Sequence, residues 1–226
     1  SKMTIHDFLK KKQESKKISM VTCYDYWSAR LLDETDIDCL LVGDSLAQVV
    51  HGFPSTISAD TNLMALHTQA VARGTNKFIV SDMPFLSVRK GLPAAMESVD
   101  LLMKAGAHAL KIEGIQGHEH IIENIVQSGV PVMGHLGLTP QSVHGLGGYK
   151  VQGRDSATYD FIFQSAQKLQ ELGCFSLVLE CVPEKLAAEI SKTLKISVIG
   201  IGAGAEVDGQ VLVLHDLLGL SLGHKP

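Results

Sequence analysis

Short hydrophobic runs recur along the chain and alternate with segments whose apolar residues have helical spacing. The run from Leu40 to Val42 ends at Gly43 and Asp44, and a continuous apolar run of this kind is typical of a parallel strand buried on both faces. Runs of the same form predict strands near 19–24, 39–44, 77–82, 109–113, 131–135, 175–180, 197–201 and 211–215.

Helices are predicted between most of these strands, near 26–35, 60–73, 93–105, 117–128, 158–172 and 183–194. A further helix at about 4–14 begins after Thr4 and has Ile5, Phe8 and Leu9 on one face. Eight strands with intervening helices are what a (β/α)8 barrel requires, so we predict an α/β fold with a single TIM-barrel domain over residues 1–226. An open, doubly wound sheet is the alternative.

The composition fits an aliphatic α/β interior and limits the partners. The 226 residues are 45% hydrophobic and 5% aromatic, and the formal net charge is −4, with acids and bases interspersed. Nothing in this distribution favours binding to nucleic acid or to an anionic membrane. A small, soluble metabolite is therefore the expected partner.

The cysteines indicate a reducing compartment. Cys23, Cys39, Cys174 and Cys181 each lie in or beside a predicted strand and form no C-x-x-C pair, which is typical of reduced, buried thiols rather than of disulfides or a zinc site. No apolar segment approaches the ~20 residues of a membrane span, and the first residues lack the apolar core of a signal peptide. We expect a cytoplasmic protein.

Several predicted strands end in an acid, among them those that close on Asp44, Asp82 and Glu113. Reacting groups of barrel enzymes lie at the C-terminal ends of the strands, so these three acids are expected together at one rim. Carboxylates so close would repel one another unless one takes up a proton or a cation binds between them, and oxygen-only ligands favour Mg²⁺. We predict a metal site; a helix cap or surface ion pair is the alternative for each acid taken singly.

Two neighbours of these acids suit substrate binding. Lys111 lies two residues before Glu113, so strand alternation puts both side chains on one face. A lysine there could hold a substrate carboxylate or form a salt bridge to one of the acids. Ser45, directly after Asp44, could donate to the same carboxylate.

Glu180 also closes an apolar run, between Leu179 and Cys181. An acid in apolar surroundings retains a proton more readily, which suits it to take a proton from carbon. A structural carboxylate satisfied by backbone amides is the alternative. His135, at the end of another strand, is either a polar wall of the site or a satisfied core histidine.

Three segments depart from the alternation. The segment from Gly134 to Asp155 contains six glycines and Pro140, so we predict a lid or substrate loop rather than a helix. Gly200 to Gly204 lacks the spacing of a dinucleotide fingerprint and is expected to allow close approach of a ligand or backbone. Residues after His215 are too few for an eighth covering helix, so we expect that the protein continues past Pro226 or that another subunit covers this flank.

Seven segments resemble one enzyme family and follow one another in the family's order. They are 41–46 (LVGDSL), 81–85 (SDMPF), 111–114 (KIEG), 134–142 (GHLGLTPQS), 147–154 (GGYKVQGR), 179–183 (LECVP) and 199–204 (IGIGAG). Together they resemble the ketopantoate hydroxymethyltransferases over nearly the whole chain, from about Val21 to Pro226.

The resemblance implies a barrel of the phosphoenolpyruvate mutase and isocitrate lyase group. It implies Mg²⁺-dependent transfer of a hydroxymethyl group from 5,10-methylenetetrahydrofolate to 3-methyl-2-oxobutanoate, which gives ketopantoate for pantothenate and coenzyme A synthesis. It also implies a ring-like homo-oligomer such as a decamer. For the residues, it implies metal ligands at Asp44, Asp82 and Glu113, substrate contacts at Asp44, Ser45, Asp82 and Lys111, and a catalytic base at Glu180.

Two other functions stay open from the sequence. A metal-dependent lyase or mutase of the same barrel group, acting on a related 2-oxo acid, would share the acids but need no folate. A barrel that binds an oxo acid without turnover is the other alternative.

Overall fold

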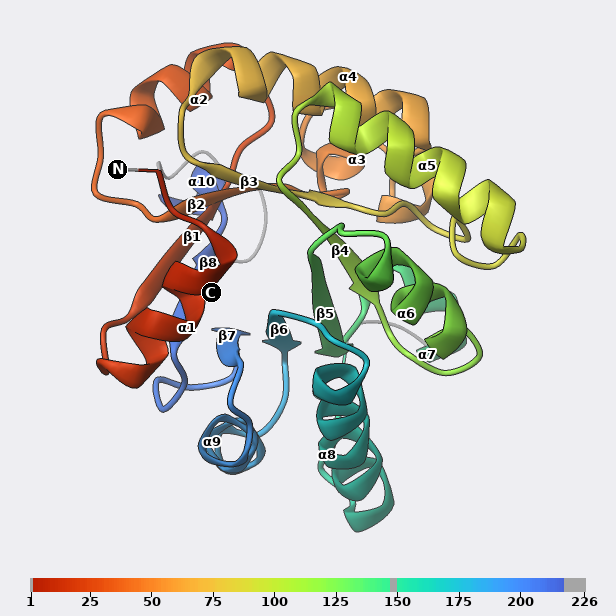
Figure 1. The fold of residues 1–226 in the computed structure, drawn as a ribbon. Coiled ribbons are helices and arrows are strands. Elements are labelled where there is room, and N and C mark those ends of the chain that lie inside the picture. Colours follow the sequence, from red (N-terminus) through yellow and green to blue (C-terminus); the bar gives the residue numbers. More distant parts are fainter. Residues whose placement is uncertain (1, 147–149, 218–226) are drawn as a thin grey trace.

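A computed structural model of the chain describes residues 2–146 and 150–217. Parallel strands form a closed barrel, in which each strand pairs with the next along the chain and the last pairs with the first (Figure 1). The strands are β1 (Ile18–Thr22), β2 (Cys39–Val42), β3 (Phe78–Asp82), β4 (Ala109–Glu113), β5 (Val132–Gly137), β6 (Ser176–Glu180), β7 (Ser197–Ile201) and β8 (Gly209–Leu212). The predicted TIM barrel is confirmed, and the open sheet is excluded.

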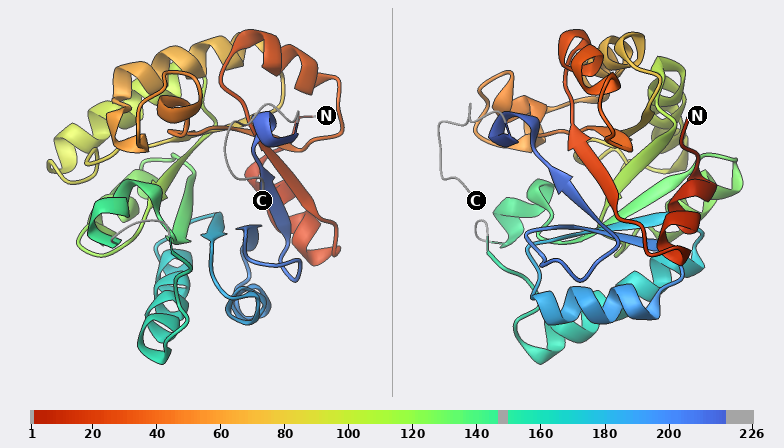
Figure 2. Two further views of the ribbon diagram at one scale, coloured as in Figure 1. Left: turned by 180° about the vertical axis from the view of Figure 1, so that it is seen from behind. Right: turned by 90° about the vertical axis from the view of Figure 1, so that its left-hand side faces the viewer.

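Helices surround the barrel and cover its outer face (Figures 1 and 2). Those predicted between strands all begin and end within about two residues of the expected bounds: α2 (Tyr26–Asp33), α4 (Thr61–Gly74), α5 (Leu92–Ala105), α6 (Glu119–Gln127), α8 (Ser156–Glu171) and α9 (Glu184–Thr193). Three of them start directly after an aspartate that accepts a hydrogen bond from a backbone N–H of the first turn, which the helix itself leaves unpaired. These aspartates are Asp25, Asp60 and Asp155.

The N-terminal helix α1 (Ile5–Gln13) corresponds to the helix predicted at 4–14. It closes one end of the barrel. Phe8 is fully buried and packs edge-on against Phe78 and Phe175, with ring centroids 5.3 and 5.1 Å away. Both partners lie at the N-terminal ends of strands, Phe78 as the first residue of β3 and Phe175 just before β6. Since α1 covers this end, the C-terminal ends of the strands are the ones open to a ligand.

Side chains inside the barrel come from alternate positions of each strand. Leu41 of β2, Val80 of β3 and Met133 of β5 pack together in the inner cluster, whereas Leu40 and Val42 belong to the layer between barrel and helices. Because successive side chains of a strand point to opposite faces, the same alternation continues to the strand ends. It directs these polar side chains into the barrel: Asp82, Lys111, Glu113, His135 and Glu180.

The last strand differs from the prediction. It begins two residues earlier than expected, and helix α10 (Leu214–Leu217) occupies positions predicted as strand. Gly209 permits the early start, because a Cβ at this position would lie 2.3 Å from the Ile18 carbonyl oxygen of β1. The Leu214 N–H donates to the Thr22 hydroxyl, which ends the ladder. The prediction about an eighth covering helix concerns positions 216–226, of which 218–226 lie outside the described residues.

Short helices that were not predicted lie in the connections: α3 (Leu46–Val49), η1 (Thr56–Ser58), η2 (Pro140–Ser142) and α7 (Val143–Leu146). The last two fall in the glycine-rich segment, where we expected no helix. Pro140 stands at the first position of η2, where its fixed φ favours a helical turn and its missing N–H costs nothing. Gly147 and Gly148 of this segment lie outside the described residues.

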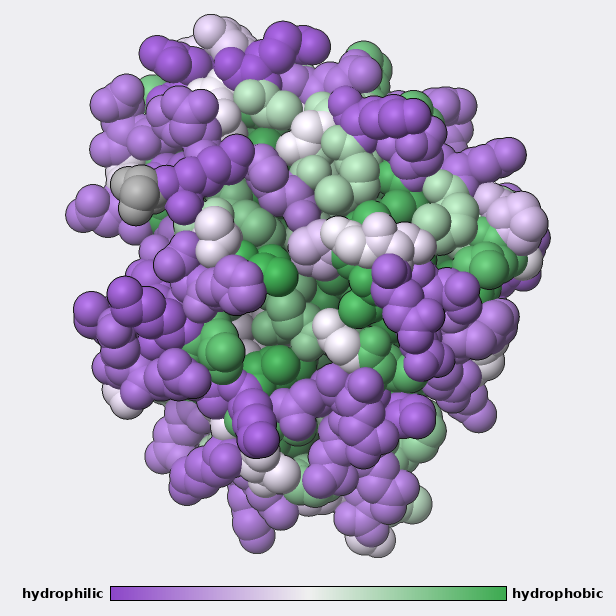
Figure 3. All heavy atoms as spheres, viewed as in Figure 1, coloured by the Kyte–Doolittle hydropathy of each residue, from purple (hydrophilic) through white to green (hydrophobic). Residues whose placement is uncertain are grey.

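The described cysteines are all free, as predicted, and Cys23, Cys39 and Cys174 are buried. Cys181 is only partly buried, contrary to the prediction, because its φ of 49° turns the chain away from the direction of β6. No helix in the described part of the chain combines the length and apolar character needed to cross a membrane. On the face shown in Figure 3, hydrophilic side chains dominate the margin and hydrophobic ones gather toward the middle.

Candidate active site

A cavity of about 230 Å³ opens at the C-terminal ends of the strands. The structure brings together in its lining all six residues that were predicted from the sequence, namely Asp44, Ser45, Asp82, Lys111, Glu113 and Glu180. They come from the end of β2 and from β3, β4 and β6, which the barrel places around one mouth. His135 of β5 lines the same cavity, so the choice left open by the sequence is resolved in favour of a wall of the site.

Lys111 is the buried cation of this cavity. Its Nζ lies 3.0 Å from Asp82 Oδ1 and 3.0 Å from His135 Nδ1. Burial acts to lower the pKa of Lys111, but the combined attraction of Asp82, Glu113 and Asp44 raises it above the ordinary lysine value. Lys111 is therefore charged at neutral pH.

Two carboxyl groups in the cavity resist ionisation. Burial, and next to it repulsion by Asp82, raises the pKa of Asp44 to about 8. Burial and repulsion by Asp44 raise the pKa of Glu113 well above its usual range. If Asp44, Asp82 and Glu113 were all ionised, their negative charge would exceed what Lys111 alone can balance, so the cavity favours an additional proton or cation.

The atoms with which these acids could bind a metal are all carboxylate oxygens. Oxygen ligands of this kind suit a hard divalent cation. Asp82 Oδ1 is buried and, despite the nearby lysine, accepts no well-aligned hydrogen bond from the described residues. Within residues 2–146 and 150–217, however, no three His, Cys, Asp or Glu side chains form a ready-made metal cluster. Asp44 and Glu113 are instead both hydrogen-bonded to Gln141.

The hydrogen-bond donors around His135 define its tautomer. A charged lysine can only donate, so His135 Nδ1 accepts from Lys111 at 3.0 Å. Burial and the Lys111 charge lower the pKa of His135, which keeps the ring neutral. The proton of the ring is then on Nε2, which donates to Glu180 Oε2 at 2.9 Å. His135 thus holds Glu180 through the acceptor oxygen Oε2.

The backbone also fixes the position of Glu180. Its carbonyl accepts the Leu138 N–H at 2.8 Å, where the chain leaves β5. Gly137 allows this approach, since its φ is 92° and a Cβ would lie 2.3 Å from the Glu180 carbonyl oxygen. After β7, a Cβ on Gly204 would lie 2.4 Å from Cγ of Glu184, so the close neighbour at this glycine is a side chain and not the ligand or backbone that we expected.

Sequence reasoning missed two polar neighbours of the predicted residues. The Tyr24 hydroxyl lies 2.6 Å from Ser45 Oγ and its ring stacks on His215, so Tyr24 orients the serine. Gln141, the other, contacts two of the acids. Neither is an acid at the end of an apolar run, and only the position of Gln141 inside the GHLGLTPQS segment gave a signal.

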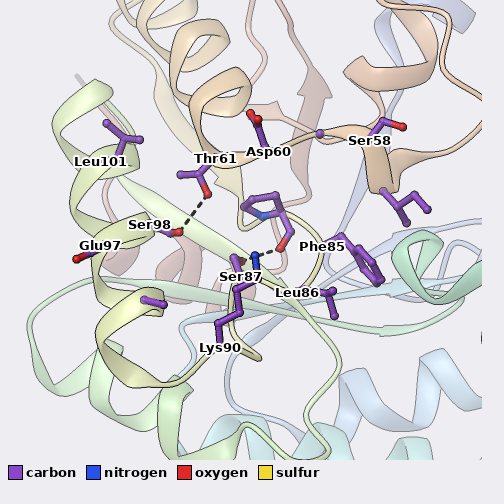
Figure 4. A pocket seen from close by; sticks show the side chains of 14 residues that line it. Ser58, Asp60, Thr61, Phe85, Leu86, Ser87, Lys90, Glu97, Ser98 and Leu101 are labelled. Carbon is purple, nitrogen blue, oxygen red and sulfur yellow. Dashed lines mark hydrogen bonds between the residues drawn. The ribbon is translucent and has the colours of Figure 1, made fainter.

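The structure has two further cavities, and the second shares Glu113 with the site. A groove of about 500 Å³ lies between the start of α4 and the loop from Pro84 to Lys90, with the Thr61 and Ser98 hydroxyls 3.0 Å apart beside it (Figure 4). A second cavity of about 340 Å³ is lined by Glu113 together with Arg89, His118 and Phe161. Either is large enough to receive part of a second substrate.

The fold matches several solved structures of enzymes. 2,3-Dimethylmalate lyase, a PEP mutase/isocitrate lyase superfamily member, superposes with a TM-score of 0.68 at 14% identity, over 96% of this chain and 84% of that chain. Phosphoenolpyruvate phosphomutase from Streptomyces platensis subsp. rosaceus gives 0.72 at 11% identity, over 96% and 83%. Phosphonopyruvate hydrolase in complex with oxalate and Mg²⁺ gives 0.71 at 10% identity, over 96% and 83%. The chain shares the closed (β/α)8 barrel fold of these proteins and has an acid-lined cavity at the barrel mouth.

Comparison of the sequence narrows the assignment from a fold to a family. Residues 2–226 match the ketopantoate hydroxymethyltransferase family. A protein of Bdellovibrio bacteriovorus named 3-methyl-2-oxobutanoate hydroxymethyltransferase is 57% identical over 224 residues, which are 99% of this chain and 85% of that protein. One of the same name from Legionella pneumophila is 54% identical over 226 residues, 99% of this chain and 86% of that protein. The chain belongs to the ketopantoate hydroxymethyltransferase family.

Proposed function

We propose that this chain transfers a hydroxymethyl group from 5,10-methylenetetrahydrofolate to 3-methyl-2-oxobutanoate, giving ketopantoate (2-dehydropantoate) for pantothenate and coenzyme A synthesis. The family and the names of the relatives support hydroxymethyl transfer. The observation that carries the proposal is the position of Glu180, which His135 holds as an acceptor beside three carboxylates and a charged lysine. Such a site can take a proton from carbon next to a polarised keto group.

Mg²⁺ is the proposed cofactor, with Asp44, Asp82 and Glu113 as the residues that would hold it. The raised pKa values of Asp44 and Glu113 support this assignment, because burial and mutual repulsion disfavour their negative charges and a divalent cation would offset both effects. When bound, the ion would polarise the keto group of the oxo acid and so lower the cost of forming an enolate. Phosphonopyruvate hydrolase, a protein with this fold, has been solved in complex with oxalate and Mg²⁺, which is consistent with the proposal.

Lys111 and Ser45 are proposed to bind the carboxylate of the oxo acid, on the same wall as Asp44 and Asp82. Lys111 is charged and buried, so its attraction to an anion is screened little by solvent. Ser45 Oγ is oriented by the Tyr24 hydroxyl and lines the same cavity. Together they would place C3 of the oxo acid against Glu180.

Glu180 is proposed as the catalytic base. It takes the proton from C3, and the electron pair of the broken C3–H bond forms the enolate and then the new bond to the one-carbon unit. Both bonds of that carbon to the folate nitrogens break, a water molecule supplies its hydroxyl group, and tetrahydrofolate leaves with the two protons set free. His135 keeps Glu180 Oε2 occupied by its Nε2–H, which leaves the other carboxylate oxygen to take the proton. The side chain of Glu180 is 18% exposed, so a substrate can reach it from the cavity.

Exchange of the C3 proton of 3-methyl-2-oxobutanoate into D₂O, followed by NMR, tests this function. We expect exchange with Mg²⁺, little exchange in EDTA, and formation of ketopantoate only after methylenetetrahydrofolate is added. An intact, Mg²⁺-loaded protein that exchanges no proton would contradict the enolate mechanism. Exchange without product after addition of the folate would favour the lyase or mutase alternative.

A further inference from the structure

Gln141 contacts two of the proposed metal ligands at once. Its side-chain Nε2 donates to Asp44 Oδ2 at 2.6 Å and to the Met83 carbonyl at 3.0 Å. Its backbone N–H donates to Glu113 Oε2 at 3.1 Å. Asp44 follows β2 and Glu113 ends β4, so this residue of η2 spans two strands that are not neighbours in the barrel.

These hydrogen bonds leave one oxygen of each acid available. No side chain or backbone N–H in the described part of the chain donates to Asp44 Oδ1, and the group near Glu113 Oε1 is His135 Nδ1, at 3.7 Å. An amide N–H is uncharged, so it orients a carboxylate without supplying the positive charge that the cavity lacks. Hydrogen bonds to the outer oxygens are the usual way in which proteins fix the carboxylate ligands of a metal.

The same contacts connect the acids to the chain that follows β5. The Leu138 N–H donates to the Glu180 carbonyl and the Ser142 N–H to the Thr139 carbonyl, each at 2.8 Å. The short segment from Leu138 to Ser142 thus has two attachments. Leu138 binds the strand of the proposed base, and Gln141 binds Asp44 and Glu113. A ligand that fixes the acids will also fix this segment, and the coupling acts equally in the other direction.

We propose that Gln141 is a positioning residue for the divalent cation. It orients Asp44 and Glu113, and it couples cation binding to the order of the segment Leu138–Ser142. The proposal rests on the metal site proposed above. It adds a neutral residue that the sequence pattern did not indicate as part of that site.

Replacing Gln141 by Leu tests this role, because it removes the side-chain donor and keeps the backbone N–H. We expect Mn²⁺, measured by electron paramagnetic resonance, to bind about 10–100-fold more weakly than to the parent protein. Mn²⁺ should slow hydrogen–deuterium exchange of the peptide that covers Leu138–Ser142 in the parent and much less in the variant. Saturating Mg²⁺ should restore C3 proton exchange, which it would not do for a damaged fold.

Gln127→Leu is the matched control, since Gln127 is exposed on α6 and its side chain donates to Glu123, outside the cavity of the acids. We expect parent-like Mn²⁺ affinity for this control. Gln141→Met, which keeps an unbranched side chain, is measured in parallel so that a folding defect of one variant does not decide the result. Parent-like Mn²⁺ affinity in a folded Gln141 variant would overturn the role of Gln141 alone. A parent protein that binds no Mn²⁺ would overturn the metal site as well.

Discussion

Lys111 determines how the protons around it are arranged, since its ammonium group has hydrogens to donate and no lone pair. Its contact at His135 Nδ1 places the ring proton on Nε2, and this proton is donated to Glu180. The hydrogen bond that holds Glu180 thus depends on Lys111, which lies two strands away in the barrel. Asp82, on the other side of the lysine, completes a line of four polar groups across the mouth.

Removing the imidazole should slow the reaction without loss of cation binding. In His135→Leu, Glu180 loses its donor and its fixed position, and a misplacement of about 1 Å can cost about 100-fold in rate. We expect the C3 exchange rate to fall by about this factor while Mn²⁺ affinity changes little. His108→Leu is the control, because His108 contacts the Ile79 backbone at the other end of the barrel. Equal loss in both variants would contradict a role for His135 in positioning the base.

At the residue scale, the sequence predicted acids and not their partners. Asp44, Asp82, Glu113 and Glu180 stand out because an acid is costly at the end of a buried apolar run. The contact between His135 and Glu180 joins positions 45 residues apart and depends on strand pairing, which no local pattern contains. Gln141 is a neutral residue in a loop, so only the family resemblance of its segment marked it.

Connections between elements depend on side chains as well as on length, as the C-terminal end of α2 shows. Asp33 accepts from the Asn76 N–H and the Thr75 hydroxyl, which join α2 to the start of β3. These hydrogen bonds lower the pKa of Asp33 below its ordinary value of 3.8. A lowered folded-state pKa stabilises the protein above the unfolded pKa, and this stabilisation is lost as the pH falls through the folded value.

Asp33→Asn should therefore lower the free energy of unfolding at pH 7, and its difference from the parent should shrink between pH 4 and pH 2. Urea unfolding at a series of pH values measures this difference. Asp36→Asn, at an exposed acid of the same connection, serves as the control and is expected to follow the parent. A difference between Asp33→Asn and the parent that grows as the pH falls would contradict the assignment.

At the element scale, periodicity predicted the long elements and failed for the short ones. Strands and helices of the first seven repeats have apolar runs or helical faces long enough to distinguish the two. The run from 211 to 215 is short and uniformly apolar except at its end, so strand and helix look alike there. A close approach at Gly209 and a side-chain hydrogen bond from Thr22 decide the outcome, and both involve β1.

The whole barrel has one closed end and one open end. Residues that stabilise the fold at the closed end therefore lie apart from the acids of the candidate site at the open end. Phe8 fills the closed end among Phe78 and Phe175, remote from the acids at the mouth. The homo-oligomer, the cytoplasmic location and the binding of folate stay predictions.

Phe8→Ala should destabilise the fold without changing the chemistry. Loss of a fully buried phenylalanine typically costs about 3–5 kcal/mol, so we expect the free energy of unfolding to fall by about that amount. Leu9→Ala, at the partly exposed neighbour on α1, should cost much less. C3 exchange by the folded fraction at low temperature should match the parent. A large loss of exchange in folded Phe8→Ala would contradict the separation of the two ends.

The central claim is that Glu180 removes the C3 proton, and Glu180→Gln tests it most directly. The amide keeps the size of the side chain but cannot accept the proton as a base, so we predict that binding of oxo acid and Mg²⁺ persists while C3 exchange into D₂O falls by about 10²–10⁴-fold. Glu184→Gln, four residues further on and exposed, should exchange at the parent rate. Parent-rate exchange in Glu180→Gln would contradict the account.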